Sequence, residues 1–378
     1  MKPPVPMALF IDDLGPRGSQ RQIVELALRL DPSRFAPRVL YYAEPSFHVP
    51  KLEAAGIPVV KIDKPSGFAP QAAWSVAREC RRCGARLIHA FLIGPNFYGA
   101  LAARALPGLV SIASERSNWP DRPLAASALE AAGYHLAHAV VANSFTAGER
   151  LRREYKVPAA KLHVIPNGVD MARFARVDDR RAEARAEFGV KLDERALLLL
   201  GSLAPAKNVP LLVEAFAEAR PRLRHRWRLL IVGPRTDAGV VAAVEERIGR
   251  FGLQDCVDLH KPIEAVERVL AAADALVLPS KWEGCPNALL EAMAAGRSVI
   301  ASRVADIPAI VGEDAGLLVP PDDLAALVKA VLQLDALDDD GRRRMGEAGR
   351  RRVAERYSME AMLDATERLY DALLAGKG

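Results

Sequence analysis

Short apolar runs rich in β-forming residues alternate with amphipathic helical patterns along the chain, and this alternation constrains the fold more than any other feature. The clearest helical pattern covers residues 19–30, where Ile23, Leu26, Ala27 and Leu30 recur at helical spacing. Because strands that alternate with helices pair in parallel, the pattern predicts an α/β fold with sheets covered on both faces. The strand candidates are 5–11, 38–42, 59–62, 87–91, 110–114, 139–143 and 162–165, followed by 196–200, 227–232, 257–259, 275–279, 298–301 and 316–319.

A turn-rich break, Pro166-Asn167-Gly168-Val169-Asp170, separates the two groups of strands. At roughly 150 residues per domain, the length of 378 residues also favours two domains. We therefore predict an N-terminal Rossmann-like domain over residues 1–170, a C-terminal one over 171–357, and a final helix over 358–378 that packs back toward the N-terminal domain. Two such parallel-sheet domains would leave a deep interdomain cleft at the carboxyl ends of their strands as the natural place for a ligand.

The composition excludes several classes of protein. Apolar residues make up 50% of the chain, which is enough to fill real cores. No apolar run comes near the ~18 residues that a membrane-spanning helix needs, and the first residues lack the pattern of a signal peptide. We therefore expect a cytoplasmic protein.

The four cysteines include a C-x-x-C pair, Cys80 and Cys83, but no second pair follows, so we predict free thiols and no metal site.

The charge is unevenly divided. Residues 1–170 carry 21 Lys and Arg against 14 Asp and Glu, whereas residues 171–378 carry 31 against 33. A basic first half favours an anionic partner, such as the inner face of the plasma membrane or a lipid diphosphate, although ordinary solvated arginines explain it equally well. The contributing residues would be Arg81, Arg82, Arg86, Arg150, Arg152, Arg153 and Lys156. Nucleic acid is not expected, because aromatic residues total only 6% and do not alternate with the basic ones.

The segment 280–296 carries the most chemical information. A loop with Gly284 and Pro286 follows an apolar strand and leads into a helix, whose first amide groups, at residues 287–289, predict a phosphate site. Glu283 and Glu291 flank that site. Since a phosphate repels carboxylates, each is expected to bind sugar hydroxyls instead. The arrangement therefore predicts a nucleotide that has a sugar at each end of its diphosphate.

The same segment reads S-x-x-E-G-x-P-N-x-x-L-E-A-M-A-x-G and resembles the signature of the retaining glycosyltransferases of family 4 (group 1), which have the GT-B fold. The resemblance implies that Glu283 contacts the hydroxyls of the donor sugar and that Glu291 holds the ribose. It also implies that the backbone between them binds the diphosphate, which assigns donor binding to Gly284, Cys285, Pro286, Asn287, Ala288 and Leu289.

Two further segments resemble phosphate-binding steps of this family. Gly18-Ser19-Gln20-Arg21-Gln22 is similar to its glycine-rich loop, although Arg17 replaces the first glycine. Residues 201–208 resemble G-R-L-x-x-x-K-N, in which the Arg and Lys hold the diphosphate. Lys207 and Asn208 are present, but Ser202 stands in place of the Arg. Arg17, Arg21 or Arg116 are candidates to replace the lost cation.

Three residues at strand ends have alternative interpretations. Arg116 lies where many relatives carry a histidine, and we predict that it faces the cleft; the alternative is a structural pairing with Glu115 or Asp121. His89 lies at a position that resembles a step of this family, but we interpret it as a buried core histidine. Asn143 is either a site residue or a cap, and the turn at 166–170 is interpreted as mainly structural.

The resemblance implies a retaining transferase that moves a sugar from a nucleotide diphosphate sugar, such as a UDP-sugar, to a hydroxyl acceptor, in the synthesis of lipid-linked polysaccharide or glycolipid. The catalytic candidates are Lys207, Glu283 and Arg116. No cofactor or metal is expected, because the only D-x-D lies in Asp338-Asp339-Asp340, which we interpret as the charged start of a helix. The alternative function is a non-catalytic partner subunit that binds a nucleotide sugar.

Overall fold

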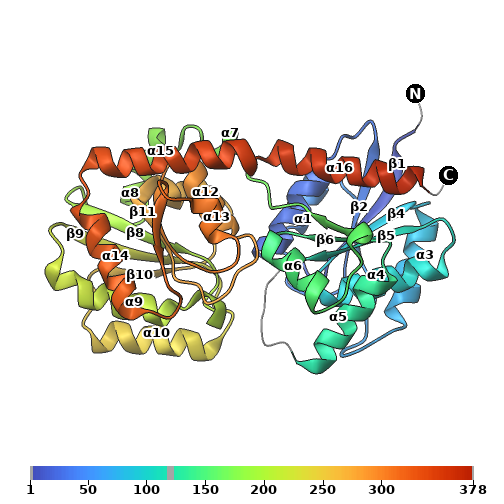
Figure 1. The fold of residues 1–378 in the computed structure, drawn as a ribbon, viewed down its shortest axis with the longest axis horizontal. Coiled ribbons are helices and arrows are strands. Elements are labelled where there is room, and N and C mark those ends of the chain that lie inside the picture. The colour runs from blue at the N-terminus through green and yellow to red at the C-terminus, as the bar shows by residue number, and fades with distance from the viewer. Residues whose placement is uncertain (1–2, 117–122, 377–378) are drawn as a thin grey trace. The chain divides into compact units, whose positions relative to one another are not determined.

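The computed structural model describes residues 3–116 and 123–376, and it divides into two compact units (Figure 1). The first unit runs to Gly168 and also takes in the chain from Glu360 onward, and the second unit is Val169–Met359. Each unit contains one parallel sheet, so the predicted fold class of two parallel-sheet α/β domains is confirmed.

The sheet of the first unit has seven parallel strands in the order β3-β2-β1-β4-β5-β6-β7. This order reverses direction between β1 and β4, which are neighbours in the sheet but not in the chain. The strands are β1 (Val5–Phe10), β2 (Phe35–Tyr41), β3 (Val59–Lys61), β4 (Leu87–Phe91), β5 (Val110–Glu115), β6 (Ala139–Ala142) and β7 (Leu162–Val164). The helices are α1 (Gly18–Arg29), α2 (Val49–Ala54), α3 (Ala72–Arg82), α4 (Ile93–Ala105), α5 (Leu124–Leu136) and α6 (Phe145–Arg153).

The last helix, α16 (Met359–Ala375), belongs to the first unit from Glu360 onward. Tyr370 is fully buried, and its hydroxyl lies 2.7 Å from Nδ1 of His89 on β4. Glu367 accepts a hydrogen bond from the amide of Asp31 at 3.0 Å and pairs with Arg34. These contacts explain why a segment far along the chain belongs to the first unit.

The sheet of the second unit has six parallel strands in the order β10-β9-β8-β11-β12-β13. The strands are β8 (Glu194–Leu200), β9 (Arg226–Val232), β10 (Val257–His260), β11 (Ala275–Leu278), β12 (Ser298–Ser302) and β13 (Gly316–Val319). The helices are α7 (Met171–Phe174), α8 (Arg181–Glu187), α9 (Val209–Ala219), α10 (Ala238–Arg250), α11 (Val266–Ala272), α12 (Asn287–Ala294), α13 (Ile307–Val311), α14 (Leu324–Ala336) and α15 (Asp339–Arg356).

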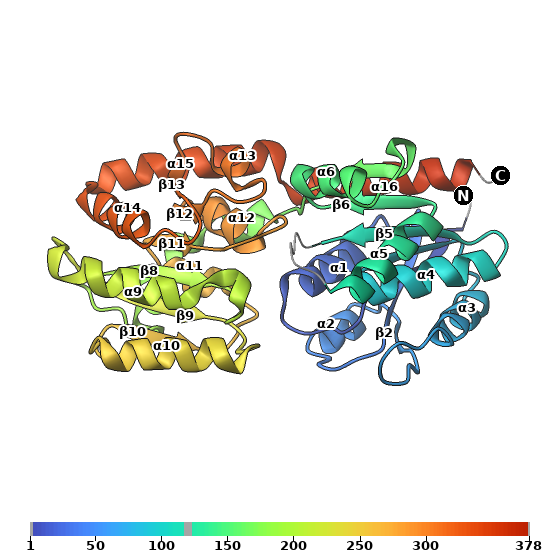
Figure 2. The ribbon, with the colours of Figure 1, turned by 60° about the horizontal axis from the view of Figure 1, so that its bottom comes forward.

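Helices lie on both faces of this sheet (Figure 2), so its strands are buried on both sides. On β8, Leu198 and Leu200 belong to one core cluster, and Leu197 and Leu199 belong to the other. Successive side chains of a strand point to opposite faces, so a continuous apolar run fits a strand with a core on each side.

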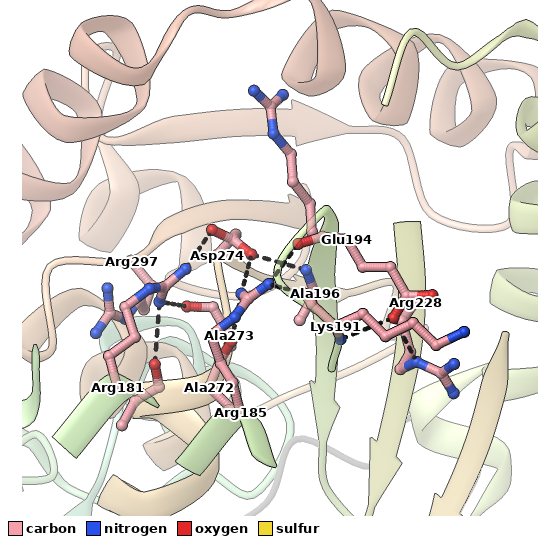
Figure 3. Close-up of polar contacts among 12 residues, drawn as sticks. Arg181, Arg185, Lys191, Glu194, Ala196, Arg228, Ala272, Ala273, Asp274 and Arg297 are labelled. Atoms are coloured by element: carbon pink, nitrogen blue, oxygen red, sulfur yellow. Dashed lines mark hydrogen bonds and ion pairs between the residues drawn. The ribbon is translucent and has the colours of Figure 1, made fainter. Parts of the chain in front are cut away.

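A polar network closes the amino edge of the second sheet (Figure 3). The guanidinium groups of Arg181 and Arg185 converge on Asp274, with N–O distances of 2.6 and 3.4 Å. Asp274 also accepts a hydrogen bond from the amide of Ala196 at 2.7 Å. Buried Arg297, which stands just before β12, donates to the carbonyl of Leu270 at 2.9 Å. These charges lie at the opposite ends of the strands from the loops that carry the family signature, so we interpret the network as structural.

Replacing Asp274 by asparagine is expected to lower the free energy of unfolding by about 3 kcal/mol, because it leaves two partly buried arginines without their shared anion. Urea denaturation measures this change. Asp193→Asn is the matched control, since Asp193 pairs with Arg226 at 3.0 Å but is 60% exposed and should change stability little. Equal losses in the two variants would show that the network does not depend on Asp274.

Within residues 3–116 and 123–376, none of the helices combines the length and the apolar character needed to cross a bilayer. The four cysteines are free thiols, as predicted. Asp338 caps α15 by accepting a hydrogen bond from the amide of Gly341 at 2.7 Å, which agrees with the interpretation of the acidic run as a helix start.

Candidate active site

Lys207 and Glu283 are in contact at the carboxyl edge of the second sheet. Lys207 lies in the segment after β8, and Glu283 lies in the loop between β11 and α12. The Lys207 Nζ is 2.5 Å from Oε1 of Glu283, and the hydroxyl of Ser280 donates to the same oxygen at 2.6 Å. Because only 18% of the lysine side chain and 10% of the glutamate side chain are exposed, two donors hold this carboxylate in a largely desolvated place.

Two glycines allow the loops around Lys207 to approach one another. A Cβ atom added to Gly201 would lie 3.3 Å from Cε of Lys207, so the lysine stem passes directly over this residue. A Cβ atom added to Gly233, which follows β9, would lie 1.9 Å from the carbonyl oxygen of Gly201. The loops after β8 and β9 are therefore packed backbone against backbone, and this packing fixes the direction of Lys207.

The helix α12 begins at Asn287, one residue after Pro286. Cys285, Asn287 and Glu291 are all buried, and Glu291 has only 6% of its surface exposed. The prediction of a free amide at Leu289 is wrong, because that N–H donates to the carbonyl of Pro286 at 3.1 Å. A phosphate at this helix start would therefore depend on the amides that precede Leu289.

Asn208 is held in a left-handed conformation, with φ of +50°, between the turn that contains Lys207 and the start of α9. Its side-chain amide donates to Oδ1 of Asp322 at 2.9 Å, and the Lys281 Nζ lies 3.0 Å from the same oxygen. Asp322 follows β13, so three strand ends are linked through one carboxylate. Sequence reasoning missed the contacts of Lys281 and Asp322, since only the pairing of distant segments reveals them. It also missed Ser280, although this residue lies in the signature three residues before its partner Glu283.

Ser202 lies beside this group but supplies no positive charge. Of the cations that could replace the missing arginine, Arg17 pairs with Asp13, four residues earlier in the first unit. Gly18, the predicted donor-binding residue of the same loop, is the first residue of α1 and is exposed. The structure thus brings Ser202, Lys207, Asn208 and the segment 283–291 together in the second unit, while Gly18 and Arg116 belong to the first.

Arg116 follows β5 and donates a hydrogen bond to Oδ1 of Asn167 at 2.6 Å. Its guanidinium carbon also lies 5.0 Å from the centre of the Phe91 ring, at the end of β4. Asn143 donates to the carbonyl of Arg116 at 3.2 Å. Glu115, the first alternative partner, pairs instead with Arg150 at 3.2 Å, and Asp121, the second, lies outside the described residues.

His89 is a satisfied core histidine, as interpreted from the sequence. Its two ring nitrogens lie 2.7 Å from the hydroxyls of Tyr370 and Ser114. Burial, together with the nearby charge of Arg116, lowers the pKa of His89 to about 3, so the ring stays neutral at physiological pH. Across the part of the chain that the structure describes, no group of three or more His, Cys, Asp and Glu could hold a metal ion.

Two family models match the chain, one in each unit. Residues 16–173 match the model described as Glycosyltransferase Family 4, and residues 194–336 match the model described as Glycosyl transferases group 1. Together they cover most of the chain, and both describe the same class of protein. The chain therefore belongs to the family 4, group 1 glycosyltransferases.

Curated relatives include two proteins named D-inositol 3-phosphate glycosyltransferase. The one from Geodermatophilus obscurus is 33% identical over 244 residues, which are 62% of this chain and 52% of the relative. The one from Streptomyces avermitilis is 32% identical over 243 residues, again 62% and 52%. The matched region thus spans about half the length of these curated relatives.

Solved structures show the same fold over nearly the whole chain. A glycosyltransferase from Rickettsia africae has a TM-score of 0.84 at 18% identity and covers 98% of this chain and 99% of its own. Anabaena HepE in complex with UDP-glucose has a TM-score of 0.83 at 21% identity and covers 97% and 99%. Sucrose-phosphate synthase from Thermosynechococcus elongatus has a TM-score of 0.81 at 23% identity, covering 98% and 100%. The fold is therefore that of the GT-B glycosyltransferases.

Proposed function

We propose that this protein is a glycosyltransferase that moves a sugar from a nucleotide diphosphate sugar to a hydroxyl acceptor. The observation that carries the proposal is the contact of Lys207 with Glu283 beside the start of α12, at the carboxyl ends of β8 and β11. Ligands of open parallel sheets bind at this edge. A cation, a helix start, the half-buried carboxylate of Glu283 and the buried carboxylate of Glu291 are together suited to a sugar diphosphate.

Each group has a distinct role in the proposed reaction. Lys207 and the first amides of α12 stabilise the negative charge that develops on the departing diphosphate. Glu283 accepts hydrogen bonds from hydroxyls of the donor sugar, and Glu291 accepts them from the ribose. As Lys207 and Ser280 hold the Glu283 carboxylate before the donor arrives, little reorganisation of this group accompanies binding.

We further propose retention of the anomeric configuration without a metal ion. The bond between the anomeric carbon and the diphosphate oxygen breaks while the acceptor oxygen bonds to the same face of that carbon. The acceptor proton passes to the departing phosphate oxygen. In this scheme the charge on the leaving group is balanced by Lys207 and backbone amides, and no protein nucleophile is required.

For the donor we propose a UDP-sugar, with support from the UDP-glucose complex of Anabaena HepE. For the acceptor we propose a hydroxyl compound, and the names of the curated relatives make D-inositol 3-phosphate the first compound to test. A lipid-linked acceptor fits the basic character of the first unit. Isothermal titration with UDP, GDP and ADP tests the donor site: UDP should bind most tightly, and failure of all three to bind would contradict the proposal.

The second candidate function is a non-catalytic subunit that binds a nucleotide sugar. It is favoured by Ser202 in place of the arginine and by the pairing of Arg17 with Asp13, which engages one replacement cation. The two functions differ in one result. A non-catalytic subunit would bind the nucleotide sugar without releasing nucleoside diphosphate in the presence of any acceptor.

We propose that the first unit also rests on an anionic membrane surface. Along α3, Trp74, Arg78 and Arg81 recur at helical spacing and are exposed, and Phe68 precedes the helix with 65% of its surface exposed. Aromatic and basic side chains on one exposed helix face are typical of interfacial helices. Arg150, by contrast, does not contribute to the predicted basic surface, because only 10% of its side chain is exposed and it pairs with Glu115.

Replacing both Phe68 and Trp74 by alanine should weaken binding to anionic vesicles by at least about tenfold, because each ring would lose roughly 1.5 kcal/mol or more of apolar contact with the bilayer. Flotation with vesicles of phosphatidylglycerol and phosphatidylcholine measures the loss. Leu192→Ala is the control, since Leu192 is 99% exposed but lies on the second unit. Equal binding by the double variant and the native protein would contradict the membrane proposal.

A further inference from the structure

Asp12 lies at the point where the first sheet reverses its strand order. It follows the end of β1 by two residues, and β1 is flanked by β2 on one side and β4 on the other. The loops after β1 and β4 lead away in opposite directions, and such reversal points are where open parallel sheets hold ligands. The roles proposed above do not use Asp12.

The backbone and one carboxylate oxygen of Asp12 are fixed by the surrounding loops. Its carbonyl accepts hydrogen bonds from the amides of Tyr42 and Ala43, at 3.0 and 2.8 Å. Its Oδ1 accepts from the amide of Asp13 at 2.8 Å and from the side chain of Gln20 at 3.4 Å. Among the described residues, no hydrogen bond ends on Oδ2. One oxygen therefore positions the carboxylate, and the other remains available.

The charges around Asp12 make this carboxylate unusual. Asp13 is paired with Arg17 and accepts a hydrogen bond from the amide of Gly15 at 2.8 Å, so most of its charge is balanced. Burial, with a smaller contribution from Asp13, raises the pKa of Asp12 to about 6, against the lowering effect of Arg17 and of the backbone hydrogen bonds. The carboxylate is thus ionised at neutral pH at a cost to the folded state.

Tyr42 supplies a second polar group at the same place. Its ring meets Phe10 of β1 and Tyr98 of α4 edge to face, with centroids 5.9 and 6.4 Å apart. A Cβ atom added to Gly94, near the start of α4, would lie 2.5 Å from the Tyr42 hydroxyl. The tyrosine therefore reaches across the end of β1 to the start of α4, and its hydroxyl makes no hydrogen bond to any described residue. Burial and the charge of Asp12 raise its pKa, so it remains a neutral donor.

The chemistry of this pair selects a ligand class. A phosphate or carboxylate ligand would be repelled by the negative charge of Asp12. A cationic ligand would be repelled by Arg17 and by the Lys64 ammonium, which lies 5.0 Å from the centre of the Tyr42 ring. A neutral hydroxyl avoids both penalties, since it donates to a carboxylate oxygen and accepts from a phenol.

We propose that Asp12 binds a hydroxyl group of the sugar acceptor through Oδ2, with the Tyr42 hydroxyl as a second contact. This inference rests on the proposed function, because it assigns the acceptor side of the same reaction. It predicts that the acceptor presents a polyol face to this site, whatever charged group it carries elsewhere.

The test compares native protein with Asp12→Asn and Tyr42→Phe. The assay measures transfer from UDP-, GDP- and ADP-glucose to glycerol, myo-inositol, glucose and D-inositol 3-phosphate. We expect Asp12→Asn to raise the acceptor KM at least about 30-fold and Tyr42→Phe to raise it several-fold, while the Kd for the nucleotide stays within twofold. Asp63→Asn is the control, since Asp63 is an exposed aspartate just after β3, which is separated from β1 by β2.

A thermal measurement separates this role from a structural one. Because the ionised carboxylate of Asp12 disfavours the folded state above the raised pKa, Asp12→Asn should increase Tm at pH 7.5 and increase it less at pH 5, where the native group is mostly protonated. A lower Tm with lost transfer would indicate a structural residue and overturn the inference. An unchanged acceptor KM, or nucleotide binding without transfer to any of the polyols, would also overturn it. Failure to bind any nucleotide would instead contradict the proposed function.

Discussion

Replacing Lys207 by alanine should lower kcat by about 10²- to 10³-fold while changing the Kd for the nucleotide diphosphate much less. Loss of one preorganised group that stabilises leaving-group charge has effects of this size in other enzymes. The Lys207 ammonium is well placed for this role, because it lies 2.5 Å from the Glu283 carboxylate and is mostly buried. The stem of the same side chain passes over Gly201. Steady-state turnover together with isothermal titration of UDP separates the two quantities.

The control for this variant is Lys329→Ala, which removes an exposed lysine of α14 in the same unit. A second variant, Lys207→Gln, tests whether the loss comes from charge or from altered packing around Gly201. If Lys207→Ala raised the Kd as strongly as it lowered kcat, the lysine would be a ground-state binding residue, and its proposed catalytic role would be wrong.

Replacing Glu291 by alanine should weaken nucleotide binding by about 100-fold or more. Hydrogen bonds from ligand hydroxyls to a charged group contribute roughly 1.5–3 kcal/mol each, and the proposed ribose contact involves two hydroxyls. Glu291 is buried at the second turn of α12, so water cannot easily replace it. Isothermal titration with UDP measures the effect, and uridine serves as the ligand that retains the ribose but lacks the diphosphate.

Glu291→Gln keeps the volume of the side chain and should lose less affinity than alanine, because an amide still accepts one hydrogen bond. Glu218→Gln on the exposed side of α9 is the matched control. Affinity for both UDP and uridine that is unchanged in Glu291→Ala would contradict the assignment of the ribose to this residue.

The strands could be predicted from the sequence because most of them are short apolar runs between turn signals. Every predicted strand is present, and the boundaries differ by at most three residues. The largest difference is in β2, which begins at Phe35 rather than 38. Proline is disfavoured inside strands, but β2 contains Pro37 because its parallel pairing with β1 extends from Phe35 onward.

The positions of site residues could be predicted from the sequence only where these residues belong to a recognisable motif. The signature placed Glu283 and Glu291 in the loop and helix after β11, and the structure has them there. The link from Asp322 to Asn208 and Lys281 joins three strand ends, and no local pattern encodes it. Likewise, the pairing of Arg150 with Glu115 joins the end of β5 to α6, which removes an arginine that composition alone had assigned to the surface.

The most direct test of the central claim, that the site around Lys207 and Glu283 supports sugar transfer, is one NMR and mass-spectrometry experiment. Native protein is incubated with UDP-glucose and the acceptor panel, and both UDP and glycosylated product are quantified. We predict equal amounts of the two, a product with the same anomeric configuration as the donor, and a fall of at least about 100-fold in Lys207→Ala. Binding of UDP-glucose without any product, or product formation at the native rate in Lys207→Ala, would contradict the claim.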